Sequence, residues 1–399
     1  MRNKSKVVFD ICLNIGAAGM PIAILQLFVY PYLAKTISSD QYGLMITMYS
    51  VWIVVSNSLG NVLNNIRLLK VNIYEELGIN GDFPVFLRHM LIINLFVIFS
   101  GTVFYTEYFD GLSIFLSILI SSLILLKAYL EVGFRINLNF GAILINGILQ
   151  SLGFVVGVLV FQIVHIWQFV FLFGFLFNTL FTAYKTGILK EKYVKTQMYK
   201  TVKRDINLYT VATFSGNLMS YADKMILYPL MGGHIVSVYY TATILGKIVS
   251  MISGPVTGVI LSYISKWKDR KKGVFSKVLI IGIVLSIAGY IITMFISYPV
   301  ISLLFPQWLK EVMVYLPITS LAIVIQTLNS FLNPFVLKFY DIKWQIIISV
   351  CSAFIYFFMA LSLWYCLGMV GFCIGTVCGQ LSKTIIMIFL NAYYKRSKS

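Results

Sequence analysis

The sequence predicts an all-α, polytopic membrane protein with about 12 transmembrane helices in two six-helix lobes. First, 59% of its 399 residues are hydrophobic and only 11% are charged, whereas soluble domains carry about 25% charged residues. Second, apolar runs of about 18 residues or more recur along the chain, and each is long enough to cross the ~30 Å hydrocarbon layer as a helix. Third, these runs do not alternate polar and apolar residues, as the strands of a membrane barrel do.

The apolar runs predict spans on both sides of a long basic segment, KTGILKEKYVKTQMYKTVKRDI. We therefore expect an N-terminal six-helix lobe at 1–186, a basic cytoplasmic linker at 187–206 and a C-terminal six-helix lobe at 207–399. The expected spans are 8–34, 42–66, 85–106, 112–134, 139–161, 165–186, 207–232, 235–264, 274–304, 312–337, 344–366 and 369–393.

The basic residues predict the orientation of these spans. If the N-terminus is cytoplasmic, 26 of the 31 lysine and arginine residues lie on the cytoplasmic side, and three lie within spans. Only Lys35 and Lys310 then lie outside. Cytoplasmic loops of membrane proteins carry such an excess of lysine and arginine, so both termini are predicted to be cytoplasmic.

Several classes of function are disfavoured by what the sequence lacks. The net charge of +17 does not indicate nucleic acid, because the basic residues form short clusters between the spans, where they meet anionic lipid. The five cysteines lie in apolar runs without metal-ligand spacing, so no metal site is expected. A membrane glycosyltransferase or polymerase would need a large external loop or paired carboxylates, and neither is evident. No P-loop is present, so direct use of ATP is not expected.

The two halves carry a short similarity that predicts parallel repeats. YPYLAKTISSDQYG at 30–43 ends the first span, and YPLMGGHIVSVYYT at 228–241 ends the seventh. The Tyr-Pro pairs align without a gap, and both stretches precede an apolar span. Two similar lobes that enclose a central cavity and rock against each other are the expected consequence.

Three lysines within the spans predict a binding site for an anionic group: Lys224, Lys247 and Lys383. A charge at the bilayer centre costs at least ~2.5 kcal/mol, so such residues face a watery cavity or a partner. Asp223 could neutralise one lysine, but adjacent side chains on a helix point ~100° apart, so it is expected to pair poorly with Lys224. Lys383 could also extend partly toward the inner surface.

Other polar residues follow helical faces within the spans. We expect seven of them to line the cavity, although such side chains also bond to neighbouring helices: Asn57, Asn61, Asn217, Tyr221, Tyr240, Gln326 and Asn329. Coupling to a proton or sodium ion is expected at Asp223, with Asp10 and Glu131 as alternatives. The alternative for Glu131 is that Lys127, Glu131 and Arg135, spaced four residues apart, anchor the inner end of a span.

Two stretches resemble the polysaccharide flippases of the MOP exporter superfamily. LAKTISSDQYGLMITMYSVW at 33–52 resembles the passage from span 1 to span 2 in that family. YADKMILYPLMGGHIVSVYYTATIL at 221–245 resembles its signature between spans 7 and 8: an acid and a base, an apolar run, a glycine turn and a tyrosine. The chain departs from the family in its short length and in having no evident midplane arginine in the N-terminal lobe.

The resemblance implies a MOP/MATE-like fold and a Wzx-type flippase in the bacterial cytoplasmic membrane. Such a protein moves a polyprenyl-pyrophosphate-linked oligosaccharide from the cytoplasmic to the external leaflet, for O-antigen, capsule or exopolysaccharide assembly. The expected partners are this substrate, membrane lipid, and a polysaccharide polymerase with its assembly proteins. No cofactor is expected beyond a proton or sodium gradient. The alternative is a MATE-like, cation-coupled antiporter of drugs or metabolites, which would favour acidic cavity residues.

Overall fold

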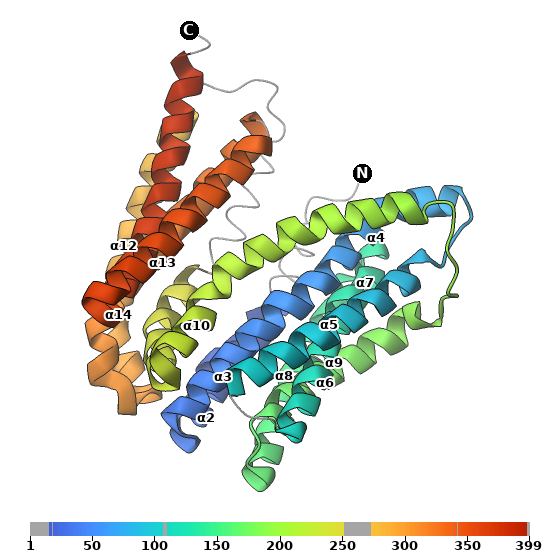
Figure 1. Cartoon of the computed structure of the whole chain (residues 1–399), viewed down its shortest axis with the longest axis horizontal. Helices are drawn as coiled ribbons and strands as arrows, with labels where there is room; N and C mark the ends of the chain where they lie inside the picture. The colour runs from blue at the N-terminus through green and yellow to red at the C-terminus, as the bar shows by residue number, and fades with distance from the viewer. Residues whose placement is uncertain (1–15, 18, 107–109, 251–272, 341, 397–399) are drawn as a thin grey trace. The chain divides into compact units, whose positions relative to one another are not determined.

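The computed structural model describes residues 16–17, 19–106, 110–250, 273–340 and 342–396 (Figure 1). Within these residues the chain forms helices joined by short turns, and no strand occurs. Backbone contacts divide the chain into two compact units, Met1–Ser237 and Val238–Ser399. We call them the N-terminal unit and the C-terminal unit. The lobe boundaries expected from the basic segment stay a prediction.

The N-terminal unit is built from antiparallel helices joined mostly by short connections. Two of its segments, η1 and η2, are π-helical turns inside longer helices. The last helix, α10, continues from this unit into the next one. The elements are η1 Leu25–Val29, α2 Tyr30–Thr36, α3 Ser39–Trp52, η2 Ile53–Asn57, α4 Ser58–Glu76, α5 Asp82–Thr106, α6 Gly111–Leu130, α7 Val132–Ile136, α8 Phe140–Val164, α9 Gln168–Thr186, η3 Ile188–Lys190 and α10 Tyr199–Ser250.

The C-terminal unit contains three long helices after the end of α10. Helix α13 packs against both α12 and α14. A core of aromatic and aliphatic side chains, including Phe275 and Phe335, joins the three. The elements are α12 Val274–Leu304, η4 Pro306–Trp308, α13 Leu309–Phe339 and α14 Ile342–Arg396.

Two glycines break the longest helices. Gly232 in α10 has φ 80° and ψ 174°, and Gly368 in α14 has φ 59° and ψ −138°. Residues with a side chain rarely adopt these positive φ values, so glycine is needed at both places. The break at Gly232 falls on the last residue of the predicted span 207–232, just before 235–264, and the break at Gly368 falls between 344–366 and 369–393. Each long helix therefore accounts for two spans.

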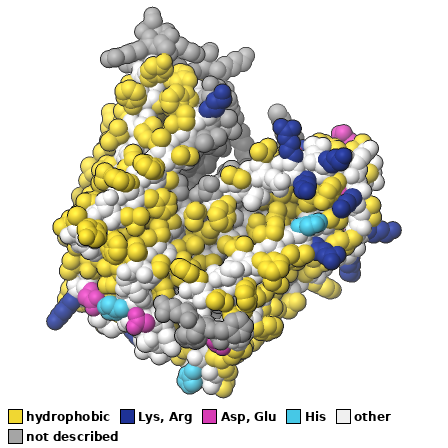
Figure 2. Space-filling view, in the orientation of Figure 1, with side chains coloured by type: hydrophobic (Ala, Val, Ile, Leu, Met, Phe, Trp, Pro, Cys, Tyr) yellow, Lys and Arg dark blue, Asp and Glu magenta, His cyan; other side chains and the backbone are white. Residues whose placement is uncertain are grey.

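The lengths and composition of the helices confirm the predicted fold class. Eight helices among the described residues are long and apolar enough to cross a membrane, and one of them, Ile347–Tyr394, contains the break at Gly368. Each of the twelve predicted ranges overlaps a helix, although 8–34 and 235–264 lie partly outside the described residues. Figure 2 shows hydrophobic side chains across the surface of both units, as expected for helices in contact with lipid. The chain is a multi-pass membrane protein.

Small residues allow the helices of the N-terminal unit to approach closely. Helix α8 packs along α9, which in turn packs against α6. A Cβ atom at Gly153 would lie 2.4 Å from the carbonyl oxygen of Phe173, and one at Gly157 would lie 2.6 Å from Cα of Val170. Such contacts are the usual means of packing helices in a membrane, where lipid is as apolar as leucine.

Candidate functional site

Lys224 lies on α10 and is almost completely buried in the N-terminal unit. Its side chain is 1% exposed, and its Nζ atom lies 2.5 Å from Oδ1 of Asp223. The ammonium group also lies 5.7 Å from the centre of the Tyr221 ring. The expectation that Asp223 and Lys224 pair poorly was therefore wrong. The flexible four-carbon stem of lysine lets its charged end turn back to the preceding carboxylate, although the two Cβ atoms point in different directions.

The first part of α10 runs antiparallel to α4 in the N-terminal unit (Figure 1). Polar contacts join the two helices at three positions. Near the middle, Nδ2 of Asn217 donates to Oγ of Ser58 at 2.7 Å. Further along, Asn65 donates to the hydroxyl of Tyr209 at 3.4 Å. At the predicted cytoplasmic end, Lys70 forms an ion pair of 2.8 Å with Asp205. The numbers rise on α4 as they fall on α10, so these contacts follow a single register.

At the predicted external end, the two stretches that suggested a repeat lie against each other. Oδ1 of Asp40 accepts a hydrogen bond from the backbone N–H of His234 at 2.9 Å. The hydroxyl of Ser237 donates to the carbonyl oxygen of Ser39 at 2.6 Å. A Cβ atom at Gly43 would lie only 1.9 Å from the carbonyl oxygen of Gly233. The part of α10 just after the break at Gly232 is therefore held by backbone contact as well as by polar groups.

Asn57 and Asn61 lie on the same helix as Ser58, near its contact with α10. Both are half-buried, and neither side chain has a hydrogen-bond partner among the residues that the structure describes. Asn57 ends the π-helical turn η2, and π-helical turns inside α-helices are frequent at functional sites. These amides are therefore available to bond the hydroxyl groups of a ligand.

In the C-terminal unit, Lys247 lies beside the aromatic ring of Tyr240. Its Nζ atom is 5.4 Å from the centre of that ring, a distance at which a cation is attracted to the face of an aromatic group. Lys247 is half-buried and Tyr240 is buried. Both belong to the second part of α10, about two helical turns apart on the predicted face.

Lys383 also lies in the C-terminal unit, on α14, close to a polar cluster. Asn329 of α13 donates from Nδ2 to Oε1 of Gln380 at 3.2 Å and accepts a hydrogen bond of 2.6 Å from Thr384. Lys383 is half-buried, and no ion pair or hydrogen bond to it occurs in the described part of the chain. Gln326, one turn from Asn329, is exposed. Asn329 therefore joins α13 to α14, whereas the polar ends of Lys383 and Gln326 have no partner in the described part of the chain.

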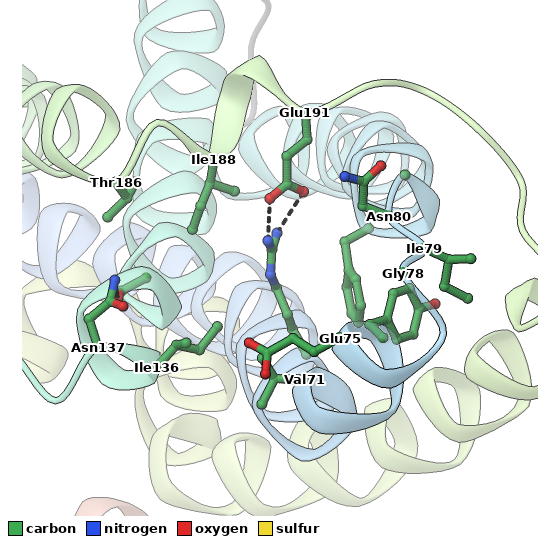
Figure 3. Close-up of a pocket in the computed structure, with 15 residues that line it drawn as sticks. Val71, Glu75, Gly78, Ile79, Asn80, Ile136, Asn137, Thr186, Ile188 and Glu191 are labelled. Carbon is green, nitrogen blue, oxygen red and sulfur yellow. Dashed lines mark hydrogen bonds and ion pairs between the residues drawn. The ribbon is translucent and has the colours of Figure 1, made fainter.

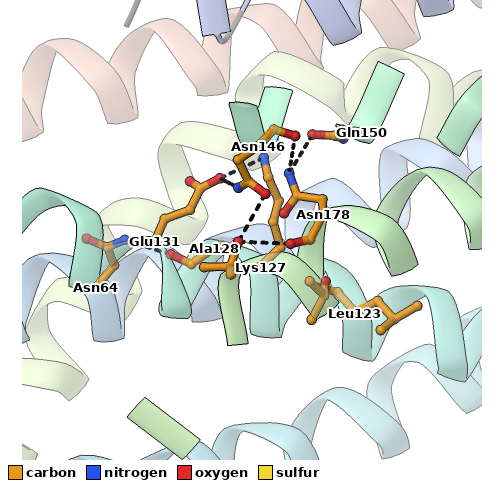
Figure 4. Close-up of polar contacts among 10 residues, drawn as sticks. Asn64, Leu123, Lys127, Ala128, Glu131, Asn146, Gln150 and Asn178 are labelled. Carbon is orange, nitrogen blue, oxygen red and sulfur yellow. Dashed lines mark hydrogen bonds and ion pairs between the residues drawn. The ribbon is translucent and has the colours of Figure 1, made fainter. Parts of the chain in front are cut away.

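Glu131 belongs to a separate polar cluster among α6, α8 and α9 (Figure 4). Its Oε1 atom lies 3.5 Å from Nζ of Lys127 and accepts a hydrogen bond of 3.3 Å from Asn146. Arg135 points elsewhere and donates to Oδ1 of Asn64 at 2.6 Å. Asn178 donates to Gln150 at 3.1 Å, while its own buried Oδ1 atom has no hydrogen-bond partner among the residues that the structure describes. Asp10, the other alternative for ion coupling, lies outside the described residues.

Sequence reasoning missed a pocket at the predicted cytoplasmic end of the N-terminal unit (Figure 3). Its volume is about 430 Å³, and the end of α4, the following turn, α7 and the segment after α9 line it. Arg67 closes one side by pairing with Glu191, and it also donates to the hydroxyl of Tyr129 at 2.6 Å. In the sequence analysis Arg67 was only one of the basic residues counted to predict the orientation of the spans in the membrane. The partners that build the pocket are distant in the chain, so spacing alone could not reveal it.

Comparisons with known proteins bear on the fold. No protein-family model and no curated protein matches the chain. Solved structures do match: an inward-facing multidrug resistance MATE transporter of the MOP superfamily, with 14% identity and a TM-score of 0.64 over 96% of this chain and 99% of that one. The lipid II flippase MurJ, in an inward closed conformation, matches with 14% identity and a TM-score of 0.72 over 96% of this chain and 87% of that one.

The chain has the fold shared by MATE transporters and MurJ. A MATE structure in a bent conformation matches similarly, with 14% identity and a TM-score of 0.61 over 98% of this chain and 96% of that one. The likeness covers nearly the whole chain in each case. It confirms the MOP/MATE-like fold that the sequence motifs predicted, and at this level of identity it shows the fold alone.

Proposed function

We propose that this protein is a flippase that moves a polyprenyl-pyrophosphate-linked oligosaccharide from the cytoplasmic to the external leaflet by alternating access. The product would serve the assembly of a cell-surface polysaccharide such as O-antigen or capsule in a bacterial cytoplasmic membrane. The fold supports a transporter, since its structural neighbours are described as a flippase and as multidrug transporters. These neighbours also disfavour an enzyme.

The proposed substrate is an anion because the lysine side chains within the helices are positively charged. Lys224, Lys247 and Lys383 all lie within predicted spans, and Lys383 has no counter-charge among the described residues. Ammonium groups form strong, charge-assisted hydrogen bonds with phosphate oxygens. A diphosphate that carries a lipid tail is the anion that would meet such groups at membrane depth. Lys383 and Lys247 are the first contacts in this proposal, because both are half-buried rather than enclosed.

Lys224 has a different place in the proposed cycle because its ammonium group is paired and enclosed. The pair with Asp223 would open in another conformation, where the pyrophosphate or a coupling ion replaces one partner. Asp223 is the first candidate for ion coupling, and Glu131 the second. The free amides of Asn57, Asn61 and Gln326 would bond the sugar hydroxyl groups, while Asn217, Tyr221, Tyr240 and Asn329 would complete the polar lining.

Two lysine variants test the proposed anion site. Lys247→Gln and Lys383→Gln, alone and together, should lower the amount of surface polysaccharide and the rate of flipping by purified protein in vesicles. Lys310→Gln is the matched control, because Lys310 is exposed and lies in a predicted external loop. Membrane levels and thermal stability of each variant must equal those of the parent. Undiminished flipping in the double variant would remove the site.

The second candidate is a cation-coupled antiporter of drugs or metabolites, and the MATE structures favour it. An antiporter would need acidic side chains to bind organic cations. Glu131, in the polar cluster among α6, α8 and α9, is the acid that would bind them in this case. The two functions differ in one measurement. An antiporter would move a cationic dye against a proton or sodium gradient and would leave lipid-linked oligosaccharide in place. A flippase would move the lipid-linked oligosaccharide and would leave the dye in place.

A further inference from the structure

The basic segment after α9 is fixed to the N-terminal unit at two points. Near its end, Asp82 accepts a hydrogen bond from the backbone N–H of Thr196 at 2.8 Å and another from the Thr196 hydroxyl. Asp82 is fully buried and also accepts from the hydroxyl of Tyr74 at 2.6 Å. Near its beginning, Glu191 pairs with Arg67. We call Ile188–Thr196 the docked segment.

Close backbone packing holds the docked segment between these points. A Cβ atom at Gly81 would lie 2.8 Å from the carbonyl oxygen of Val194 and 3.0 Å from that of Lys192, so only glycine fits there. Just beyond the segment, the rings of Phe86 and Tyr199 stack with centres 4.8 Å apart. The segment therefore packs on the unit through its backbone and through Ile188, which is buried, and Glu191 and Thr196, which are half-buried.

The other side of the docked segment combines apolar and basic side chains. Leu189, Tyr193 and Val194 are 50%, 59% and 49% exposed. Lys190, Lys192 and Lys195 are also exposed. The segment has one acid, Glu191, and this is the residue that pairs with Arg67. In Figure 2, lysine and arginine side chains gather at one end of the N-terminal unit, where Figure 1 draws the end of α4 and the beginning of α10.

This mixed face continues from the lipid-facing side of α9. Leu180 is 59% exposed, and Tyr184, one turn later, is 84% exposed. Lys185 follows at the end of the helix and is exposed. Tyrosine is enriched where a membrane meets water, and lysines beside that boundary are attracted to anionic lipid. The side chains along this part of α9 change from apolar to aromatic to basic, as they do where a helix passes from the hydrocarbon layer into water.

We propose that the docked segment is a binding surface for the headgroups of anionic phospholipids in the leaflet that it faces, which is predicted to be cytoplasmic. Lys190 and Lys192 contact the phosphate groups, while Leu189, Tyr193 and Val194 enter the boundary between headgroups and acyl chains. Because hydrogen bonds to Asp82 hold the segment in place, little conformational entropy is lost when lipid binds. The surface is independent of which molecule the protein transports.

The test compares lipid binding by two variants that lose the same charge. Purified full-length protein is titrated with phosphatidylglycerol and with phosphatidylcholine, and bound lipids are counted by native mass spectrometry. Lys190→Gln/Lys192→Gln should weaken the tightest phosphatidylglycerol binding by about 25-fold, or fivefold for each lysine, from ~1 kcal/mol each. Neither side chain has a described contact, so docking should persist. The control Lys35→Gln/Lys310→Gln, on the predicted external side, should leave this binding unchanged.

Three results would overturn the proposal. The first is equal phosphatidylglycerol binding by the two double variants. The second is displacement of the lipid by inorganic pyrophosphate at equal concentration, which would indicate a site for a soluble phosphate group. The third is unchanged lipid binding by Thr196→Val. This variant removes a hydrogen bond to Asp82 without altering the charge, and we expect it to weaken the preference for the anionic lipid. Thermal unfolding of each variant shows that it remains folded.

Discussion

Lys224 donates a hydrogen bond to the carboxylate of Asp223, its neighbour in sequence, at 2.5 Å, and the lysine side chain is 1% exposed. The same carboxylate oxygen also accepts the backbone N–H of Lys224 at 3.0 Å. The ring of Tyr221 covers the ammonium group from the preceding turn. A charge that is expensive within the bilayer is thus neutralised locally, and a change in either partner should affect both stability and transport.

Removing one member of the pair should cost more than removing both. Asp223→Asn leaves the Lys224 ammonium group buried without a counter-charge, and the free energy of unfolding should fall by about 3 kcal/mol. Asp223→Asn/Lys224→Met should recover most of that loss, because an apolar pair needs no hydration. Thermal unfolding of purified protein in detergent measures both effects.

The same variants separate structure from transport. The double variant should remain inactive in flipping although it is stable, because neither an ion nor a pyrophosphate can replace a partner that is gone. Full activity of the double variant would show that the pair only neutralises charge. Equal stability of Asp223→Asn and the parent would instead contradict the burial of an unpaired cation.

The helices could be predicted from the sequence, because the bilayer imposes length and apolarity on every span. The break at Gly232 also follows from the sequence, since a glycine pair separates two apolar runs. The pair of Asp223 and Lys224 could not be predicted, because Cβ directions do not describe the reach of a long side chain. Asn329 bonds to Gln380 and Thr384, which lie about fifty residues later in the chain. Only the packing of α13 on α14 reveals these two partners.

The contact between Gly43 and Gly233 should not tolerate a methyl group. In Gly43→Ala the new Cβ atom would lie 1.9 Å from a backbone oxygen, which cannot move as a side chain would. The two chain segments must separate, and overpacking of this kind costs about 2–3 kcal/mol. Gly19→Ala is the control, because no described atom beyond its own turn of helix lies within 4 Å of the added methyl group. Melting temperatures of the two variants measure the difference, and similar values would contradict the close approach.

The hydrogen bond from Asn217 to Ser58 should contribute a measurable coupling between α10 and α4. Hydrogen bonds between membrane helices average about 0.6 kcal/mol and reach about 1.7 kcal/mol. At 2.7 Å and partly buried, this bond should lie in the upper part of that range. A double-mutant cycle of Ser58→Ala and Asn217→Ala measures the coupling free energy. The pair Ser302→Ala and Asn217→Ala, in which the residues share no described contact, should give none.

Asp110 should make the stability of α6 depend on pH. Its carboxylate caps the helix by accepting the backbone N–H groups of Leu112 at 3.2 Å and Ser113 at 3.3 Å. Hydrogen bonding, chiefly with the side chain of Ser113, lowers the pKa of Asp110 below its ordinary value of 3.8. Because the pKa is lower in the folded state, this stabilisation is complete above 3.8 and is lost as the pH falls through the folded value.

Two variants distinguish the charge of Asp110 from its capping geometry. Asp110→Ala should lower the free energy of unfolding by about 1 kcal/mol at neutral pH, because two N–H groups lose their acceptor. Asp110→Asn keeps an oxygen that can cap the helix, so it should resemble the parent at neutral pH and lose the acid dependence of this site. Thermal unfolding from neutral pH down to about pH 3 records both effects. Equal destabilisation by alanine and asparagine at neutral pH would show that the charge, rather than the cap, stabilises the helix.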